Sequence, residues 1–154
     1  PTIEEAALGL AIHDYGVKNV ALVGPSVLRI LGQYPRPLNI AYVAIPKQRP
    51  TIKTPWGVIR FIKRDLTTFE LDYKQTENIA GYVTTREETF IDLLRKRPDW
   101  YISEGTRGEM INTLSNMIDK NKVFECAKKN NGMRSLEKYS EFEKVFAKTI
   151  RKTG

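Results

Sequence analysis

One group of residues has part of the pattern of a nucleotide-binding site. Gly24 and Ser26 form a turn between two apolar runs typical of strands. Nucleotidyltransferases grip phosphate with such a Gly-Ser turn and hold Mg²⁺ on two acids at alternate residues of the next strand, because the cation needs anionic oxygen ligands. In this chain the alternate residues of that strand are Asn39, Ala41 and Val43, and none of them is an acid. The sequence therefore predicts no metal here and a turn that begins a helix.

A second group is the acid-x-Lys pattern of Asp72 and Lys74. This spacing puts a carboxylate and an ammonium on one face of a strand, as in metal-dependent nucleases. A nuclease needs a further acid upstream, but Asp65 lies only a short distance before Asp72, and Asp14 falls on the first predicted helix. A solvated strand face is the alternative interpretation.

The single cysteine and the single histidine complete the reactive side chains. One Cys and one His cannot supply the four Cys/His ligands of a usual zinc site. Cys126 falls in an apolar helical stripe, which predicts a buried and inert thiol. His13 lies at the end of the first predicted helix, where a histidine more often packs or interacts with the helix dipole than acts as a catalytic base. We expect no catalytic residue, no metal and no cofactor.

The third group is basic. The chain has 25 Lys+Arg against 18 Asp+Glu, a net charge of +7, and residues 47–64 carry six basic residues and no acid. These six candidate nucleic-acid or partner-binding residues are Lys47, Arg49, Lys53, Arg60, Lys63 and Arg64. With the rings of Trp56 and Phe61 nearby, they would suit phosphates and stacked bases, or an acidic partner protein. Residues 120–154 form a second basic block, and the segment between the blocks is acidic.

Length and composition limit the class of protein. A chain of 154 residues, 41% hydrophobic and 28% charged, can build one hydrophobic core and is too apolar for a disordered tail. Its apolar runs are too interrupted for a membrane span, so we expect no membrane partner. The single cysteine excludes a disulfide framework and indicates a cytoplasmic protein.

The elements that must position these residues change in character near residue 85. Before it, we expect a helix over 2–16, capped by Thr2 with Glu5, and a helix that begins at Pro25. The expected strands are 19–24, 38–46, 57–64, 68–74 and 78–84, the last three antiparallel. In the segment 57–64, alternation places Val58, Arg60, Ile62 and Arg64 on one face and Ile59, Phe61 and Lys63 on the other.

Beyond residue 85 the pattern is helical. A capping box at Thr85 opens a helix that ends before Pro98, and a second box, Thr106 with Glu109, opens another. Two further helices are expected over 122–129 and 135–152. The fold class is therefore α/β (α+β), with a mixed or largely antiparallel sheet in an N-terminal half and a helical C-terminal half. The predicted division is an α/β core over 1–98 and a helical subdomain over 99–154.

Three motifs together resemble the C-terminal effector domain of AbiEi-type antitoxins of type IV toxin–antitoxin systems, over about residues 19–100. The residues that match are Gly24, Ser26, Leu28 and Gly32 in the first motif, Val43, Ile45 and Pro46 in the second, and Glu87, Thr89, Asp92 and Leu93 in the third. Most of these residues are of types that pack or cap.

The resemblance implies a non-enzymatic regulatory domain. In that family the toxin is a nucleotidyltransferase, and a separate N-terminal winged helix, which these residues do not contain, commonly binds the promoter. The expected function is neutralisation of such a toxin, transcriptional repression of its operon, or both. Two alternatives stay open: a nuclease-like or nucleotidyltransferase-like enzyme, and a nucleic-acid-binding accessory module that uses residues 47–64.

Overall fold

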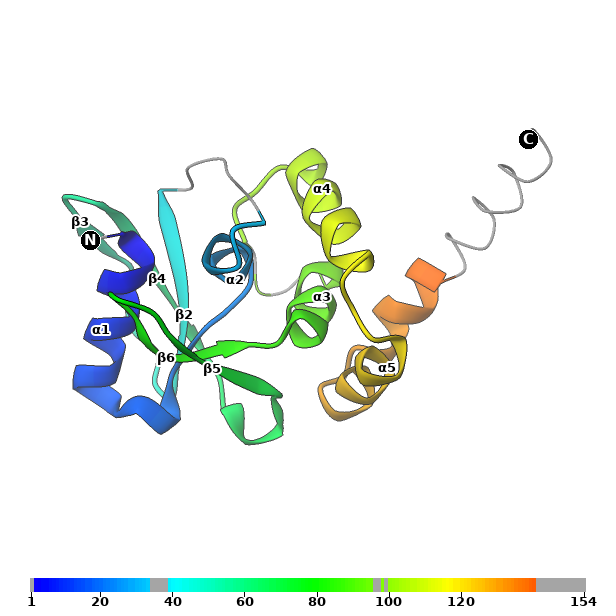
Figure 1. Cartoon of the computed structure of the whole chain (residues 1–154), viewed down its shortest axis with the longest axis horizontal. Coiled ribbons are helices and arrows are strands. Elements are labelled where there is room, and N and C mark those ends of the chain that lie inside the picture. The colour runs from blue at the N-terminus through cyan, green and yellow to red at the C-terminus, as the bar shows by residue number, and fades with distance from the viewer. Residues whose placement is uncertain (1, 34–38, 96–97, 99, 141–154) are drawn as a thin grey trace.

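The computed structural model describes residues 2–33, 39–95, 98 and 100–140. Its helices and strands follow one another in the order α1 (Ile3–Tyr15), β1 (Ala21–Leu22), α2 (Pro25–Ile30), β2 (Ile40–Ile45), β3 (Ile52–Thr54), β4 (Gly57–Lys63), β5 (Leu71–Gln75), β6 (Ala80–Thr84), α3 (Arg86–Leu94), α4 (Glu104–Ser115) and α5 (Lys120–Lys129) (Figure 1). Two 3₁₀ turns, η1 (Val17–Asn19) and η2 (Leu66–Thr68), precede β1 and β5. The predicted α/β class is confirmed.

The described strands form one mixed sheet in the order β3-β4-β2-β1-β6-β5. The pairs β2–β4 and β1–β6 are parallel, whereas β1–β2, β3–β4 and β5–β6 are antiparallel. The strand β5 therefore pairs antiparallel with β6 as expected, but β4 joins the sheet beside β2 and in the same direction. This parallel pairing is possible because the chain passes through β3 between the two strands.

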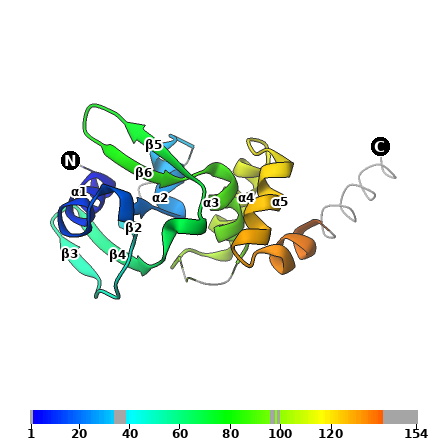
Figure 2. The same ribbon diagram turned by 90° about the horizontal axis from the view of Figure 1, so that it is seen from below.

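Alternation along the strands builds two cores, one on each face of the sheet. On β2, Ala41, Val43 and Ile45 pack beneath α1, whereas Tyr42 and Ala44 face α2 and α3. Seen from below, α1 lies on one side of the sheet and α3, α4 and α5 succeed one another away from it (Figure 2). The expected alternation on β4 is confirmed, because Ile59 and Phe61 join the α1 core and Ile62 joins the other.

Local capping chemistry explains where several helices begin and end. The hydroxyl of Thr2 accepts the backbone N–H of Glu5, and that of Thr85 accepts the N–H of Glu88, so both predicted N-caps are confirmed. The helix α2 ends at a Schellman motif, in which Gly32 adopts φ +69° and its N–H binds the carbonyl of Arg29.

The predicted start of α4 was wrong. Ser103 is the N-cap, and its hydroxyl accepts the N–H of Thr106, so that Thr106 lies inside the first turn. Both residues are good capping types, and with Ser103 as the N-cap the helix begins three residues earlier than predicted. Residues 133–140 are helical, and the remainder of the helix expected over 135–152 lies outside the described residues.

The core between the sheet and α3 continues into the helical half without interruption. Buried side chains from β1, β2 and α2 belong to the same cluster as Met110 and Leu114 of α4 and Cys126 of α5. Over the described residues, no helix combines the length and apolar character needed to cross a membrane.

Candidate functional site

The Gly24 turn is filled by the indole of Trp100. Gly24 adopts φ +60°, and a Cβ built on it would lie 2.6 Å from the Cζ3 atom of Trp100. Ser26 is fully buried, and its hydroxyl accepts the backbone N–H of Tyr42 at 2.8 Å. The turn that resembles a phosphate-binding loop is thus part of a packed core.

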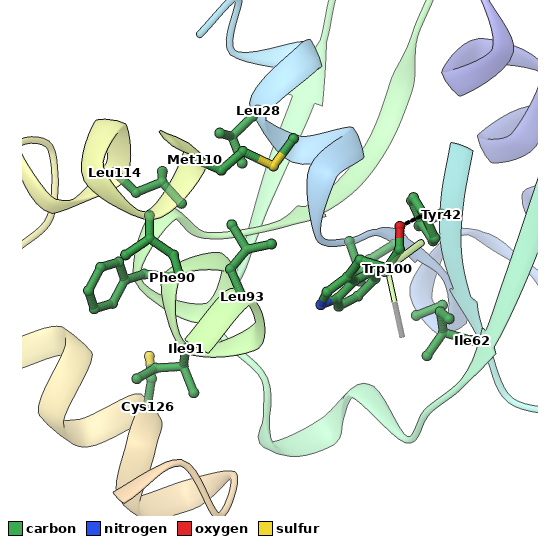
Figure 3. Close-up of a cluster of buried hydrophobic side chains, with 14 of the residues drawn as sticks. Leu28, Tyr42, Ile62, Phe90, Ile91, Leu93, Trp100, Met110, Leu114 and Cys126 are labelled. Atoms are coloured by element: carbon green, nitrogen blue, oxygen red, sulfur yellow. Dashed lines mark hydrogen bonds between the residues drawn. The ribbon is translucent and has the colours of Figure 1, made fainter. Parts of the chain in front are cut away.

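Three further contacts hold Trp100 in this position. Its ring meets that of Tyr42 edge to face, with centroids 5.1 Å apart, and the Tyr42 hydroxyl donates to the Trp100 carbonyl (Figure 3). Its indole N–H donates to the carbonyl of Asp92 at 3.2 Å. The indole therefore joins β2, the Gly24 turn and α3.

The carboxylate of Asp92 is fully buried and connects α3 to the end of β4. It binds the guanidinium of Arg64, just after β4, through two hydrogen bonds of 2.8 and 3.1 Å. Arg95 lies close by, and its Nε and Nη2 atoms are buried without a hydrogen-bond partner among the described residues. Burial lowers the pKa of Arg95, while the negative charge of Asp92 opposes that shift. Asp92 thus neutralises a small buried basic cluster.

The other motif residues also connect elements of the fold. The Glu87 carboxylate accepts the backbone N–H of Asp119 at 3.2 Å and so ties α3 to the start of α5. The Thr89 hydroxyl donates to the carbonyl of Thr85 and lies 2.9 Å from the Thr84 hydroxyl. The residues that carry the family resemblance are therefore scaffold residues, and surface residues must make any partner contact.

The structure divides the six basic residues of 47–64. Arg64 is bound to Asp92 inside the protein, and Arg49 binds Asp14 at 2.7 Å while its guanidinium lies 4.7 Å from the Phe61 ring centroid. Because side chains alternate along β4, Lys63 lies on the α1 face of the sheet, as Phe61 does.

Two members of the basic block lie on the opposite face. Lys53 is paired with Val58, and Arg60 lies 3.9 Å from the ring centroid of Tyr101, which is 63% exposed. Lys47 is exposed just after β2. The six residues do not form one continuous patch on a single face.

Asp72 and Lys74 lie on β5, at an edge of the sheet. They line a depression of about 290 Å³ together with Glu87 and Asp119. Both of these acids are engaged at the start of α5, since Asp119 caps that helix and Glu87 accepts the Asp119 N–H. Two strands, β1 and β6, separate β5 from β2, so the two predicted enzyme-like groups do not share a pocket.

Cys126 is buried, as predicted, and it lies beside two carboxylates that the sequence did not indicate. Burial is the main cause that raises the pKa of its thiol, and the charges of Glu88 and Glu70 raise it further. Glu88 is itself buried, and its carboxylate accepts the N–H of Glu70 and the amide of Asn130. His13 is exposed on α1 and contacts Asp14.

Among the described residues, no group of three His, Cys, Asp or Glu side chains is placed to hold a metal ion. The structure defines a mixed-sheet α/β domain with helices on both faces and a buried polar network around Trp100 and Asp92. Compared with known proteins, the chain matches no family model, and a search of the curated proteins finds no match.

Sequence reasoning missed Trp100, which is the centre of this arrangement. A large aromatic residue two positions after a proline gives no local signal that it will pack on a glycine far away in the chain. It also left Lys18 out of the basic groups, although the structure brings Lys18 and Lys63 to one pocket.

Proposed function

We propose that this chain is a non-enzymatic regulatory domain of the AbiEi antitoxin type, which neutralises a nucleotidyltransferase-type toxin through protein contacts. The observation that carries the proposal is the packing of Trp100 on Gly24. A phosphate-binding turn must present backbone N–H groups to its ligand, and this requires an open approach. Here the protein's own indole occupies that approach, and the Ser26 hydroxyl accepts a backbone N–H within the fold.

The second strand supports the same proposal. Ala41 and Val43 stand where a nucleotidyltransferase would have its metal-binding acids, and both are buried beneath α1. Apolar side chains supply no anionic oxygen to a divalent cation. The resemblance to a nucleotide-binding turn is thus better explained as a shared scaffold than as shared catalysis.

The distribution of charge supports a protein partner over direct binding of DNA. DNA affinity depends on cations that meet successive phosphates along one surface. In this chain Arg49 and Arg64 already pair with Asp14 and Asp92, and the other members of the basic block lie on different faces. Repression of an operon would then require a separate DNA-binding domain, as the family resemblance implies.

Co-expression tests the antitoxin proposal. The chain is expressed together with the product of any nucleotidyltransferase-type gene that neighbours its own, and we expect growth to be restored relative to that toxin alone. An unrelated domain of similar size and charge, expressed to the same level, is the control. Unchanged toxicity with soluble chain present would contradict the proposal.

A second experiment tests the enzyme alternatives directly. Purified chain is incubated with Mg²⁺, labelled nucleoside triphosphates and RNA, and both nucleotide transfer and RNA cleavage are followed. We expect neither. Metal-dependent cleavage by the wild type that is lost in Asp72→Ala would replace the proposal with a nuclease, whereas nucleotide transfer would replace it with an active nucleotidyltransferase.

A further inference from the structure

A pocket of about 520 Å³ lies at the edge of the sheet where β2 and β4 end. Because these strands are parallel, both carboxyl ends meet at this edge. The strand β1 is antiparallel to β2, with Ala21 opposite Ala44, so the turn η1 before β1 reaches the same edge. Lys18 and Asn19 of η1 therefore face the pocket together with Pro46 and Lys63.

The segments that follow β2 and β4 border this pocket. From β2 the chain passes to β3 at one margin of the sheet, and from β4 it passes to β5 at the other. The space beyond the carboxyl ends of parallel strands is a usual place for ligands in open α/β sheets. In this chain η2 forms the far wall, through Leu66 and Thr67.

The walls combine cations with apolar surface. The lining residues in the described part of the chain include the basic residues Lys18, Lys63 and Arg64 and one acid, Asp65. The Asp65 carboxylate faces its own chain, because it accepts the backbone N–H of Thr67 at 3.0 Å and caps η2. Arg64 is neutralised by Asp92. Lys18 and Lys63 are thus the two exposed cations left for a ligand.

The surrounding sequence strengthens this positive field. From residue 15 to residue 64 the chain contains nine Lys and Arg residues and no acid. That segment supplies η1, β2 and β4, which are the elements that meet at the pocket. A small anion approaching this edge therefore meets little repulsion from the elements on that side.

We propose that this pocket binds a small phosphorylated ligand, with Lys18 and Lys63 holding the phosphate and with Leu66 and Leu71 contacting its apolar part. The volume lies within the range of small-molecule sites. Two ammonium groups from separate elements suit a phosphate, since each gives charge-assisted hydrogen bonds to its oxygens. The inference does not rest on the proposed antitoxin function.

Titration of the whole chain with adenosine 5′-monophosphate, followed by ¹H–¹⁵N NMR, tests the proposal. We expect saturable shifts of the backbone amides of Lys18, Asn19 and Thr67. Adenosine, which lacks the phosphate, is the matched ligand and is expected to leave these amides unshifted. Inorganic phosphate is expected to compete for the same site.

Variants distinguish binding in this pocket from attraction of the ligand by the net charge of the protein. Lys63→Ala is expected to weaken binding by about tenfold, while Lys63→Arg keeps most of the affinity. Lys53→Ala removes an equal charge from the adjacent strand β3, outside the pocket, and is expected to have no effect. The spectra also report whether each variant is folded.

Three results would overturn the proposal. The first is the absence of saturable shifts with either phosphate compound. The second is equal binding of adenosine and its monophosphate. The third is an equal loss of affinity in Lys53→Ala and Lys63→Ala, which would indicate binding by net charge alone.

Discussion

The guanidinium of Arg64, just after β4, holds the carboxylate of Asp92 on α3 through two hydrogen bonds, and both side chains are almost wholly buried. The same guanidinium lies 4.5 Å from the ring centroid of Phe69. The backbone carbonyl of Asp92 also accepts the indole N–H of Trp100. The ion pair therefore fixes the helix that positions Trp100 over the Gly24 turn.

Removing the charge of Asp92 is expected to cost more than removing that of Arg64. Asp92→Asn removes the counter-charge of the buried Arg64 and leaves Arg95 with Glu88 alone, so the free energy of unfolding should fall by about 3–5 kcal/mol. Arg64→Gln should cost less, because Arg95 remains as a charge partner of Asp92. Urea denaturation of both variants measures the difference. Equal losses would show that Arg95 does not share Asp92.

Gly24→Ala is expected to destabilise the protein. Its left-handed backbone conformation is unfavourable for alanine by about 1–3 kcal/mol, and the new methyl group meets the Trp100 ring. In a Trp100→Ala background the same substitution should cost less, because only the backbone strain remains. Urea denaturation of the single and double variants gives the coupling between the two residues.

Gly9→Ala provides the matched control for this substitution. Gly9 lies in α1, and a Cβ there would meet no atom within 4 Å. We expect a gain of roughly 0.5–1 kcal/mol, since glycine is a poor residue inside a helix. For Gly24→Ala and Trp100→Ala, a double variant whose loss of unfolding free energy equals the sum of the two single losses would contradict a direct clash.

Ser26→Ala tests the polar half of the same turn. The backbone N–H of Tyr42 would lose its acceptor inside the core, at a cost of about 1–3 kcal/mol. Ser115→Ala, at an exposed hydroxyl on α4, is expected to change stability little. Urea denaturation compares the two, and similar small effects would indicate that another group satisfies Tyr42.

Glu88 should make stability depend on pH. Burial raises its pKa above the ordinary value of 4.5, although hydrogen bonds from Glu70 and Asn130 oppose the shift. The folded state then binds a proton more tightly than the unfolded chain, so the free energy of unfolding falls as the pH rises from about 4.5 through the raised pKa.

Glu88→Gln should flatten this dependence, and the variant should gain most relative to the wild type near neutral pH. Denaturation curves across the pH range measure both effects. Glu137→Gln, at an exposed carboxylate, is the control. A pH dependence identical in wild type and Glu88→Gln would exclude Glu88 as its source.

The Cys126 thiol should react slowly with thiol reagents in the folded protein. Burial, with Glu88 and Glu70 nearby, raises its pKa, and the thiolate is the reactive form. We expect labelling at neutral pH to accelerate when urea opens the helical half. Because Cys126 is the single cysteine, the labelling rate reports local opening around α5 without further engineering. Rapid labelling without denaturant would contradict the buried position.

Local features of this fold were predictable because their causes are local. A threonine three residues before the N–H that it accepts explains the starts of α1 and α3, and alternation explains which side chains of β2 and β4 face each core. The start of α4 was missed because Ser103 and Thr106 both satisfy the same local rule. The parallel pairing of β2 with β4 was missed because strand alternation carries no information about neighbours.

The candidate sites depend on distant contacts. The sequence by itself determined the α/β class, the two basic blocks around an acidic segment, and the inert character expected of Cys126, since composition and short-range pattern are sufficient for these. Only the tertiary structure decided that Trp100 fills the Gly24 turn, that Arg64 forms a buried ion pair with Asp92, and that Lys18 and Lys63 line the same pocket. Such contacts arise from how strands and helices pack, and packing joins residues whose separation along the chain leaves no periodic signal.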